Sequence, residues 1–121
     1  MSKLLMAIDI GTSAAKISLF NISGEVICTY LGEYDTYYPE TGFVEHDPDD
    51  WWQVICKGVK YFKKEHAINP EDIEAIGVDG LSWAGLPVDK QGNPLRRVMI
   101  WLDRRAEKQA NWMKEKVGEG E

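Results

Sequence analysis

The first part of the chain alternates between short apolar stretches and turn residues. Residues 4–8 form a near-continuous apolar run, which is typical of a strand covered on both faces. Residues 16–22 alternate between polar and apolar side chains, and Ser23-Gly24 separates them from a second strand-like stretch at residues 26–31. This pattern predicts three successive strands, of which the last two form a hairpin.

A long helix is predicted after these strands. Residues 32–47 carry several aromatic side chains without a steady period, which is typical of a long ordered loop. Asp47 is a candidate N-cap, Pro48 suits the first helical position, and the acidic residues that follow face the positive end of the helix dipole. Apolar side chains then recur every three or four residues, so we expect the helix to run to about His66.

The remainder of the chain predicts a strand, a small hairpin and a second helix. Residues 73–78 read as a buried strand that ends at the Asp79-Gly80 turn. Residues 86–101 suggest two short strands around a tight turn. Residues 103–117 are helical by period, with Asp103 as the candidate N-cap.

The order of these elements indicates an α/β fold with a mixed sheet. Three antiparallel strands come first, and a helical crossover then leads to a further strand beside the first one. This is the ribonuclease-H-like arrangement, which differs from a strictly alternating doubly wound sheet.

Length and composition narrow the function classes. A chain of 121 residues is expected to form one domain. With 14 basic and 20 acidic residues the net charge is −6, which disfavours general nucleic-acid binding. No apolar window approaches the roughly 18–20 residues that a membrane span requires, and Asp9 interrupts the apolar start before it could act as a signal peptide. We expect a cytoplasmic protein whose two cysteines, Cys28 and Cys56, are reduced.

The most informative stretch is Asp9-Ile10-Gly11-Thr12-Ser13. A strand that delivers a carboxylate into a tight turn of Gly, Thr and Ser offers backbone N–H groups and two hydroxyls to a polyphosphate, while Asp9 could orient its magnesium ion. Lys16 adds positive charge nearby. The stretch is neither a Walker loop nor a dinucleotide fingerprint, and an ordinary hairpin turn is the alternative.

A second candidate segment follows the predicted strand that ends at Asp79. Ser82 could donate a hydrogen bond to a hydroxylated ligand, and Trp83 could stack on the apolar face of a sugar ring. The alternative is that Trp83 belongs to the core and that Asp79 only forms a turn.

The third candidate segment is residues 101–106. Arg104 and Arg105 lie beside a predicted helix start, where they oppose the dipole, so one of them is expected to pair with a carboxylate or a ligand. His46 and His66 lack the spacing of metal ligands, which argues against a zinc site.

Together these segments resemble the amino-terminal part of the FGGY family of carbohydrate kinases, within the actin-like ATPase superfamily. The resemblance covers essentially the whole chain and rests on four motifs in the right order: residues 7–13, 45–52, 75–92 and 100–106. Because an accidental turn would not bring the other motifs with it, the combined match favours the phosphate interpretation of Asp9.

The resemblance implies two ribonuclease-H-like domains around a cleft, in which the γ-phosphoryl group of ATP moves to a sugar or polyol hydroxyl. It implies ATP and Mg²⁺ as cofactors. The implied site residues are Asp9 for magnesium, Gly11, Thr12, Ser13 and Lys16 for the phosphates, and Ser82, Trp83, Trp101 and Asp103 for the sugar.

The identity of the sugar does not follow from the resemblance. Xylulose kinases usually have Gln-Met-His, and glycerol kinases Gln-Arg-Glu, where this chain has Leu81-Ser82-Trp83. The chain looks closest to the xylulokinase-like branch.

The resemblance also implies parts that residues 1–121 do not contain. In the family the general base is an Asp far downstream, and the adenosine pocket lies in the carboxyl-terminal domain. We therefore expect residues 1–121 to be a single partial domain that is inactive alone, since phosphoryl transfer needs both walls of the cleft. Its expected partners are a sugar or polyol and that missing domain, and apolar surface left exposed could produce a homodimer.

Two other functions stay open at this point. A ribonuclease-H-like nuclease would hold two metal ions between Asp9 and Asp79, although the net charge of −6 argues against a nucleic-acid substrate. A non-catalytic binding domain of the same fold would show no response to nucleotide.

Overall fold

The structure, a computed structural model, describes residues 3–118. It has two helices, six strands and one short 3₁₀ turn, and the predicted strands at residues 4–31, the two helices and the strand between them appear in the predicted order, whereas β4 (Glu45–His46) lies in the segment predicted to be a loop. They are β1 (Leu4–Ile10), β2 (Ala14–Asn21), β3 (Val26–Glu33), β4 (Glu45–His46), α1 (Pro48–Glu65), η1 (Pro70–Asp72), β5 (Ile73–Asp79), β6 (Val98–Met99) and α2 (Glu107–Val117).

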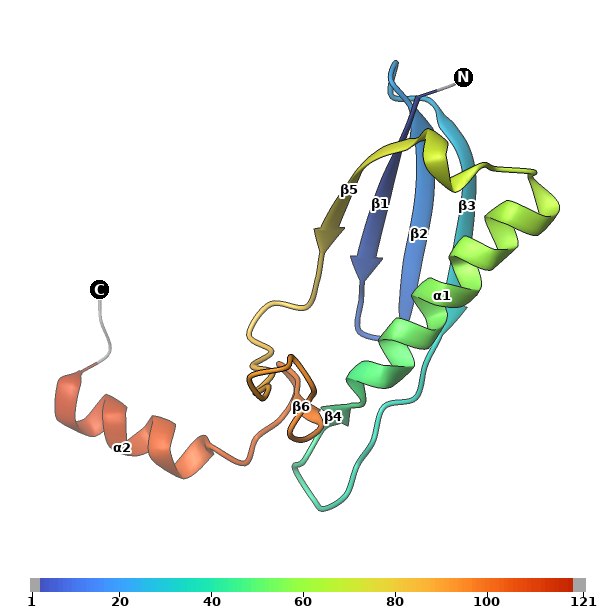
Figure 1. Cartoon of the computed structure of the whole chain (residues 1–121). Helices are drawn as coiled ribbons and strands as arrows, with labels where there is room; N and C mark the ends of the chain where they lie inside the picture. The colour runs from blue at the N-terminus through green and yellow to red at the C-terminus, as the bar shows by residue number, and fades with distance from the viewer. Residues whose placement is uncertain (1–2, 119–121) are drawn as a thin grey trace.

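The main sheet has the strand order β3-β2-β1-β5. The pairs β1–β2 and β2–β3 are antiparallel, whereas β5 is parallel to β1. Helix α1 makes the crossover between β3 and β5 and lies across one face of the sheet (Figure 1). The predicted α/β fold, with three antiparallel strands and a helical crossover to a strand beside the first, is confirmed.

The core lies between α1 and the sheet. Alternate residues of β1 and β2 point toward the helix, and α1 presents Val54, Gly58 and Phe62, which are spaced four residues apart and therefore share one face. The buried core residues are Leu4, Met6, Ile8, Ala15, Ile17, Leu19, Cys28, Val54 and Phe62.

Two glycines let α1 approach the sheet closely. A Cβ atom on Gly32 would lie 2.5 Å from Val54 Cγ1, and one on Gly58 would lie 2.9 Å from Tyr30 Cδ1. Both distances are shorter than van der Waals contact, so the helix can rest on β3 only because these side chains are absent.

The start of α1 is as the sequence predicts. The Asp47 carboxylate accepts a hydrogen bond from the Asp49 backbone N–H at 3.1 Å, Pro48 occupies the first turn, and His66 is the C-cap. Both cysteines are free, as expected for reduced thiols.

The expectation that β1 is covered on both faces is wrong. Leu4, Met6 and Ile8 are buried, but Leu5 is 40% exposed on the opposite side. Helix α1 covers one face only, and no described element covers the other. We call this second surface, which includes Leu5, Ala7, Phe20 and Gly77, the open face; two hollows of about 440 and 460 Å³ lie on it.

The prediction that residues 73–78 form a buried strand is also wrong. The strand exists as β5, but Ile76 and Val78 are 60% and 67% exposed. They neighbour Met6 and Ile8 across the β1–β5 pair. Because β5 is an edge strand and α1 packs over β2 and β3, the Ile76 and Val78 side chains are left exposed, whereas Ile73 at the start of the strand packs against the core.

The hairpin near residue 90 is only partly as predicted. A tight turn follows Asp89, and Val88 and Pro94 form an isolated bridge. The strand that follows, β6, pairs with β4 in a two-stranded sheet instead of with residues 86–89.

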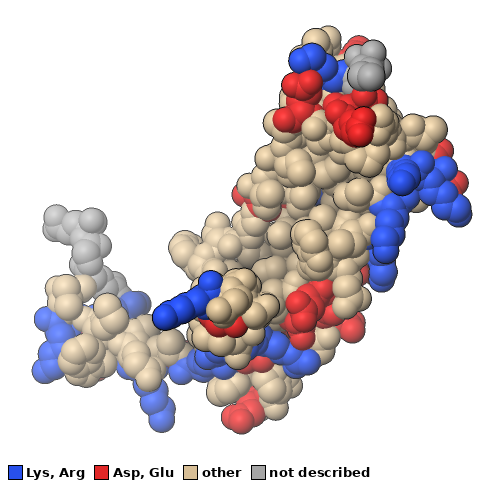
Figure 2. Space-filling model, viewed as in Figure 1, with Lys and Arg blue, Asp and Glu red and all other residues tan. Residues whose placement is uncertain are grey.

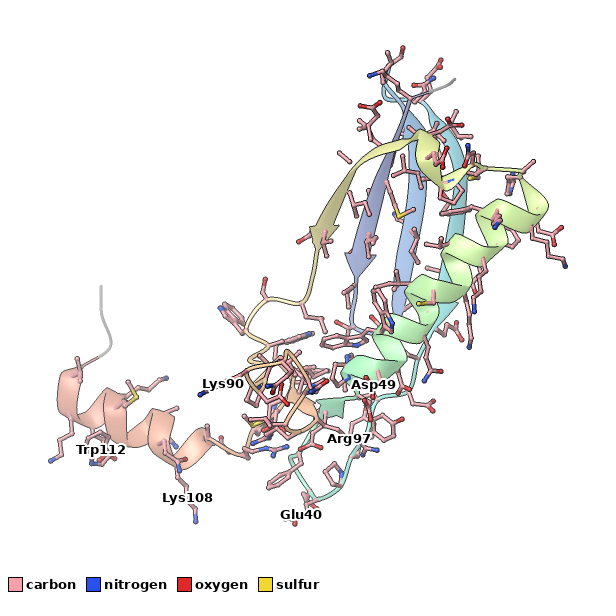
Figure 3. The ribbon with its side chains drawn as sticks, in the orientation of Figure 1. Glu40, Asp49, Lys90, Arg97, Lys108 and Trp112 are labelled. Atoms are coloured by element: carbon pink, nitrogen blue, oxygen red, sulfur yellow. The ribbon has the colours of Figure 1, made fainter. Side chains whose placement is uncertain are left out.

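The second helix begins later than predicted. Its N-cap is Ala106, without a side-chain cap, so the prediction that Asp103 caps this helix is wrong. Helix α2 projects away from the sheet, and its Lys108 and Trp112 side chains point away from the other elements (Figures 1 and 3). Within residues 3–118, neither α1 nor α2 combines the length and apolar character that a bilayer-crossing helix needs.

Candidate functional site

The turn between β1 and β2 is where the candidate chemistry begins. We call residues 9–13 the Gly11 turn. The Gly11 N–H donates to the Ala14 carbonyl at 3.0 Å, which closes the turn between the two strands. Asp9, at the end of β1, lies opposite Lys16 on β2 and opposite Asp79 on β5.

A hollow of about 310 Å³ opens beside this turn. It brings together two segments that are far apart in sequence, the Gly11 turn and the residues that follow β5. The Trp101 indole N–H donates to the Thr12 hydroxyl at 3.2 Å and so ties a third segment to the turn. The lining includes six of the predicted site residues: Asp9, Gly11, Thr12, Ser82, Trp83 and Trp101.

The other three predicted site residues lie around this hollow. Lys16 lines one of the hollows of the open face, which shares Asp9 with the first hollow. Asp103 lines another neighbouring hollow of about 290 Å³, which shares Trp83 and Trp101. Ser13 is exposed on the turn itself, and its carbonyl accepts a hydrogen bond from the Tyr34 N–H at 3.4 Å.

Trp83 has an unusual conformation and a highly exposed ring. Its φ of 56° lies in the left-handed region, which is costly for a bulky residue, and its side chain is 89% exposed. The alternative that Trp83 belongs to the core is therefore wrong. Asp79 does act as a turn former, because its carboxylate accepts a hydrogen bond from the Gly80 N–H at 2.9 Å.

Asp103 and Arg105 form an ion pair near the site. The Asp103 carboxylate accepts hydrogen bonds from Arg105 Nη2 at 2.7 Å and from the Val44 N–H at 2.7 Å. The Arg105 hydrogen bond is the main reason that the pKa of Asp103 falls to about 2. Arg105 Nη2 also contacts Glu45 Oε1 at 2.6 Å. The expectation that one of the two arginines pairs with a carboxylate is confirmed.

Further arginines gather where β4, β6 and the start of α1 meet. Arg97 lies over the Tyr37 ring at 3.5 Å and 3.6 Å from the Asp47 carboxylate, and Arg96 lies 3.9 Å from Glu45. Lys and Arg side chains gather in this region on the face shown in Figure 2, with Asp and Glu side chains beside them. Figure 3 places Arg97 beside the segment that leads into α1. The charges are paired locally, which is typical of a structural junction.

Two residues behind the Gly11 turn were missed by sequence reasoning. The Tyr34 hydroxyl donates to the Gly11 carbonyl. His46 is fully buried; its Nδ1 accepts from the Trp51 indole N–H at 3.2 Å, and its Nε2 lies 3.1 Å from the Thr36 hydroxyl. Since Nδ1 accepts, the ring proton must be on Nε2. The aromatic side chains between residues 34 and 51 were the signal available in the sequence, but nothing in their spacing shows that Tyr34 reaches the turn and that His46 packs against it.

His46 should make folding sensitive to acid. Burial lowers the pKa of His46, although a hydrogen bond to the Thr12 backbone and the Asp50 charge act in the opposite direction. An unfolded histidine titrates near pH 6.5, so the unfolded chain binds a proton first as the pH falls. We expect the free energy of unfolding to decrease below about pH 6.5, by at most about 1.4 kcal/mol per pH unit.

Denaturant unfolding between pH 7.5 and 5 measures this dependence. His46→Gln should flatten the curve, whereas His66→Gln should leave it unchanged, because His66 is the exposed C-cap of α1. Identical slopes in the wild type and in His46→Gln would contradict the assignment.

One carboxylate, that of Asp9, lines the hollow and could bind a cation. Among residues 3–118, no group of three His, Cys, Asp or Glu side chains is arranged to hold a metal ion. Mg²⁺ does not require such a cage, since it commonly binds through one or two carboxylates together with substrate phosphates and water. Asp9, exposed at the rim of the hollow, fits that pattern.

Comparison with known proteins gives one family. The model of the N-terminal domain of the FGGY family of carbohydrate kinases matches residues 4–121. The chain is 32% identical over 114 residues to a xylulose kinase from Staphylococcus xylosus, covering 94% of this chain and 23% of that protein. It is 36% identical over 106 residues to a glycerol kinase from Thermoanaerobacter pseudethanolicus, covering 87% of this chain and 21% of that protein.

The fold has close counterparts among solved structures. The crystal structure of a xyloylose kinase from Brucella ovis superimposes with a TM-score of 0.86 at 24% identity, covering 94% of this chain and 24% of that one. The chain thus spans less than a quarter of the length of each of these proteins.

Proposed function

The chain belongs to the FGGY family of carbohydrate kinases, and on this premise we propose that it forms one wall of a cleft in which ATP phosphorylates a sugar or polyol hydroxyl. The observation that carries the proposal is the 310 Å³ hollow, which joins the Gly11 turn to Ser82, Trp83 and Trp101. A volume at the low end for ligand sites suits a small carbohydrate or a phosphate tail better than a whole nucleotide.

The Gly11 turn is proposed as the phosphate side of the hollow. Gly11, Thr12 and Ser13 would approach the phosphate oxygens through backbone N–H groups and hydroxyls, and Lys16 would add positive charge from β2. Asp9 would hold Mg²⁺. When bound, that ion supplies charge neutralisation on the phosphate oxygens.

The opposite side of the hollow is proposed as the sugar side. The exposed Trp83 ring offers a flat apolar surface for the C–H face of a sugar, and the Ser82 hydroxyl can exchange hydrogen bonds with sugar hydroxyls. Trp101 would close the hollow from a third side, with Asp103 in the neighbouring hollow. A xylulose-type sugar is the substrate we favour, from the resemblance of the chain to that branch.

The hollow lacks a second acid-base group. Within residues 3–118, Asp9 is the only titratable side chain that lines it. If Asp9 holds the cation, no group remains there to deprotonate the attacking hydroxyl. We therefore propose that residues 1–121 are a single partial domain, that the general base and the adenosine site belong to a C-terminal domain, and that the chain alone is inactive.

The proposed partners are the carbohydrate and that C-terminal domain, in a cytoplasmic enzyme. Nucleic acid and membrane are not among them. Without the C-terminal domain, the apolar open face of the sheet would be the surface of self-association, so we expect homodimers of the isolated chain.

The nuclease alternative is disfavoured by the family and by the site. A two-metal nuclease needs several acidic or histidine ligands at one point, and no such group of three exists among residues 3–118. Asp79 instead uses its carboxylate locally, on the Gly80 N–H.

A titration of the isotope-labelled chain with Mg²⁺ and ATP tests the phosphate assignment. We expect NMR shift changes at the amides of Gly11, Thr12 and Ser13, with a Kd on the order of millimolar because the adenosine contacts are missing. Mg²⁺ alone and ATP with a chelator are the controls. Saturating nucleotide without shifts at these three amides would contradict the proposal.

An assay of turnover is the second part of this test. Incubation with ATP, Mg²⁺ and a panel of pentuloses and polyols should give no product above background. Turnover in the usual enzyme range would support a kinase but would refute the assignment of the base to another domain.

A further inference from the structure

The back of the Gly11 turn is held by Tyr34 at two carbonyls. The Tyr34 hydroxyl donates to the Gly11 carbonyl, and the Tyr34 N–H donates to the Ser13 carbonyl at 3.4 Å.

Because the peptide bond is planar, these contacts also fix the directions of the neighbouring backbone N–H groups. In a trans peptide, the carbonyl of one residue and the N–H of the next point in opposite directions. With the Gly11 carbonyl held on the side of Tyr34, the N–H group of Thr12 must face the other way. Neither Tyr34 nor His46 lines the hollow that Gly11 and Thr12 share with Trp83.

The two rings are themselves fixed by a third. The centroids of Tyr34 and His46 are 5.4 Å apart at 69°, and those of His46 and Trp51 are 5.7 Å apart at 82°, so the three rings pack edge to face. Trp51 belongs to the first turn of α1 and donates its indole N–H to His46. The back of the turn is therefore connected to the rigid helix.

From this geometry we propose that Tyr34 is a positioning residue for phosphate binding. By holding the Gly11 carbonyl from behind, it aims the amide of Thr12 at the phosphate oxygens. The inference rests on the proposed function, because it assigns to this residue the preorganisation of that same phosphate site.

The protonation state of Tyr34 supports this role. Burial and the nearby Asp9 carboxylate raise the pKa of Tyr34 to about 12. The phenol therefore keeps its proton at any physiological pH and remains a donor to the Gly11 carbonyl.

Tyr34→Phe tests the inference, because it removes only the hydroxyl and keeps the ring contact with His46. Tyr37→Phe is the matched control: its hydroxyl donates to the Asp50 carboxylate at 2.8 Å, and Tyr37 does not line the hollow. Two quantities are measured, the hydrogen-exchange rate of the Gly11 amide without ligand and the Kd for Mg²⁺ with ATP.

We expect Tyr34→Phe to speed exchange of the Gly11 amide and to weaken binding, each by about threefold to tenfold, the range of one hydrogen bond. Tyr37→Phe should change either quantity by less than about twofold. If Tyr34→Phe and Tyr37→Phe behave alike in both measurements, the inference is overturned. If the wild type does not bind the nucleotide at all, the proposed function fails, and the exchange rate still decides whether Tyr34 holds the turn.

If Tyr34→Phe is less stable, both variants are compared at a temperature at which circular dichroism shows them folded, so the test remains decisive.

Discussion

Asp9→Asn should remove the magnesium dependence of nucleotide binding and weaken the Kd for Mg²⁺ with ATP at least about tenfold, or roughly 1.4 kcal/mol. The substitution keeps the size of the side chain but replaces a charged oxygen ligand by a neutral amide, which is a poor partner for a hard cation. Because Asp9 is exposed at the rim of the hollow, the free energy of unfolding should change little. The amide shifts of Gly11, Thr12 and Ser13 measure the effect.

Asp79→Asn is the matched control for this prediction. Asp79 lies opposite Asp9 in the β1–β5 pair, so it carries the same charge at nearly the same place in the sheet. Its carboxylate is used on the Gly80 N–H, and we expect its replacement to leave the magnesium dependence intact. Equal losses in both variants, together with magnesium-dependent cleavage of an RNA–DNA hybrid by the wild type, would contradict the kinase assignment and favour a nuclease.

Phe62→Ala should have the largest effect on stability, lowering the free energy of unfolding by about 3–5 kcal/mol. Phe62 is 1% exposed and lies on the face of α1 that packs against the sheet. Its removal leaves a cavity that the surrounding strands cannot close, because Gly58 already brings the helix into contact with Tyr30 and Ile17. Chemical denaturation followed by far-ultraviolet circular dichroism measures the loss.

Trp52→Ala is the control for the cavity. The Trp52 side chain is 64% exposed on the same helix, so its truncation removes more atoms but little buried contact. We expect a loss below about 1 kcal/mol. A loss at Phe62 no greater than that at Trp52 would show that the packing of α1 on the sheet does not limit stability.

Local signals in the sequence predict the elements of this fold well. The start of α1 could be predicted from Asp47 and Pro48 alone, because capping depends on residues that are neighbours in the chain. Strands β1, β2 and β3 could be predicted from the period of their apolar residues and from the turns between them. The segments of the site were also visible, since Gly11, Thr12, Ser82 and Trp83 stand at strand ends, where open sheets bind ligands.

Properties that depend on distant contacts were not predictable in the same way. An apolar period in residues 73–78 indicates a strand, but it cannot show that α1 lies over β2 and β3 and leaves Ile76 and Val78 exposed. Asp103 has the composition of an N-cap, yet its carboxylate is taken by the Val44 N–H and the Arg105 side chain. The preference of aspartate for an N-cap position is outweighed here by the charged hydrogen bond to Arg105 and by the hydrogen bond to Val44, which is distant in sequence.

The same reasoning explains why the rings behind the Gly11 turn escaped notice. Tyr34 reaches the Gly11 turn only because β2, β3 and the following loop fold back, and His46 lies against the Tyr34 ring. Nothing in the sequence around Tyr34 and His46 marks them as neighbours of this turn.

The parallel β1–β5 pair has a consequence for the order in which the chain folds. The hairpins β1–β2 and β2–β3 join strands that are adjacent in sequence, whereas β5 pairs with β1 across the intervening strands and α1. Closing that longer loop costs more chain entropy than forming the hairpins. We therefore expect the wall that carries Ser82 and Trp83 to assemble after the Gly11 turn, so that the hollow between them forms late in folding.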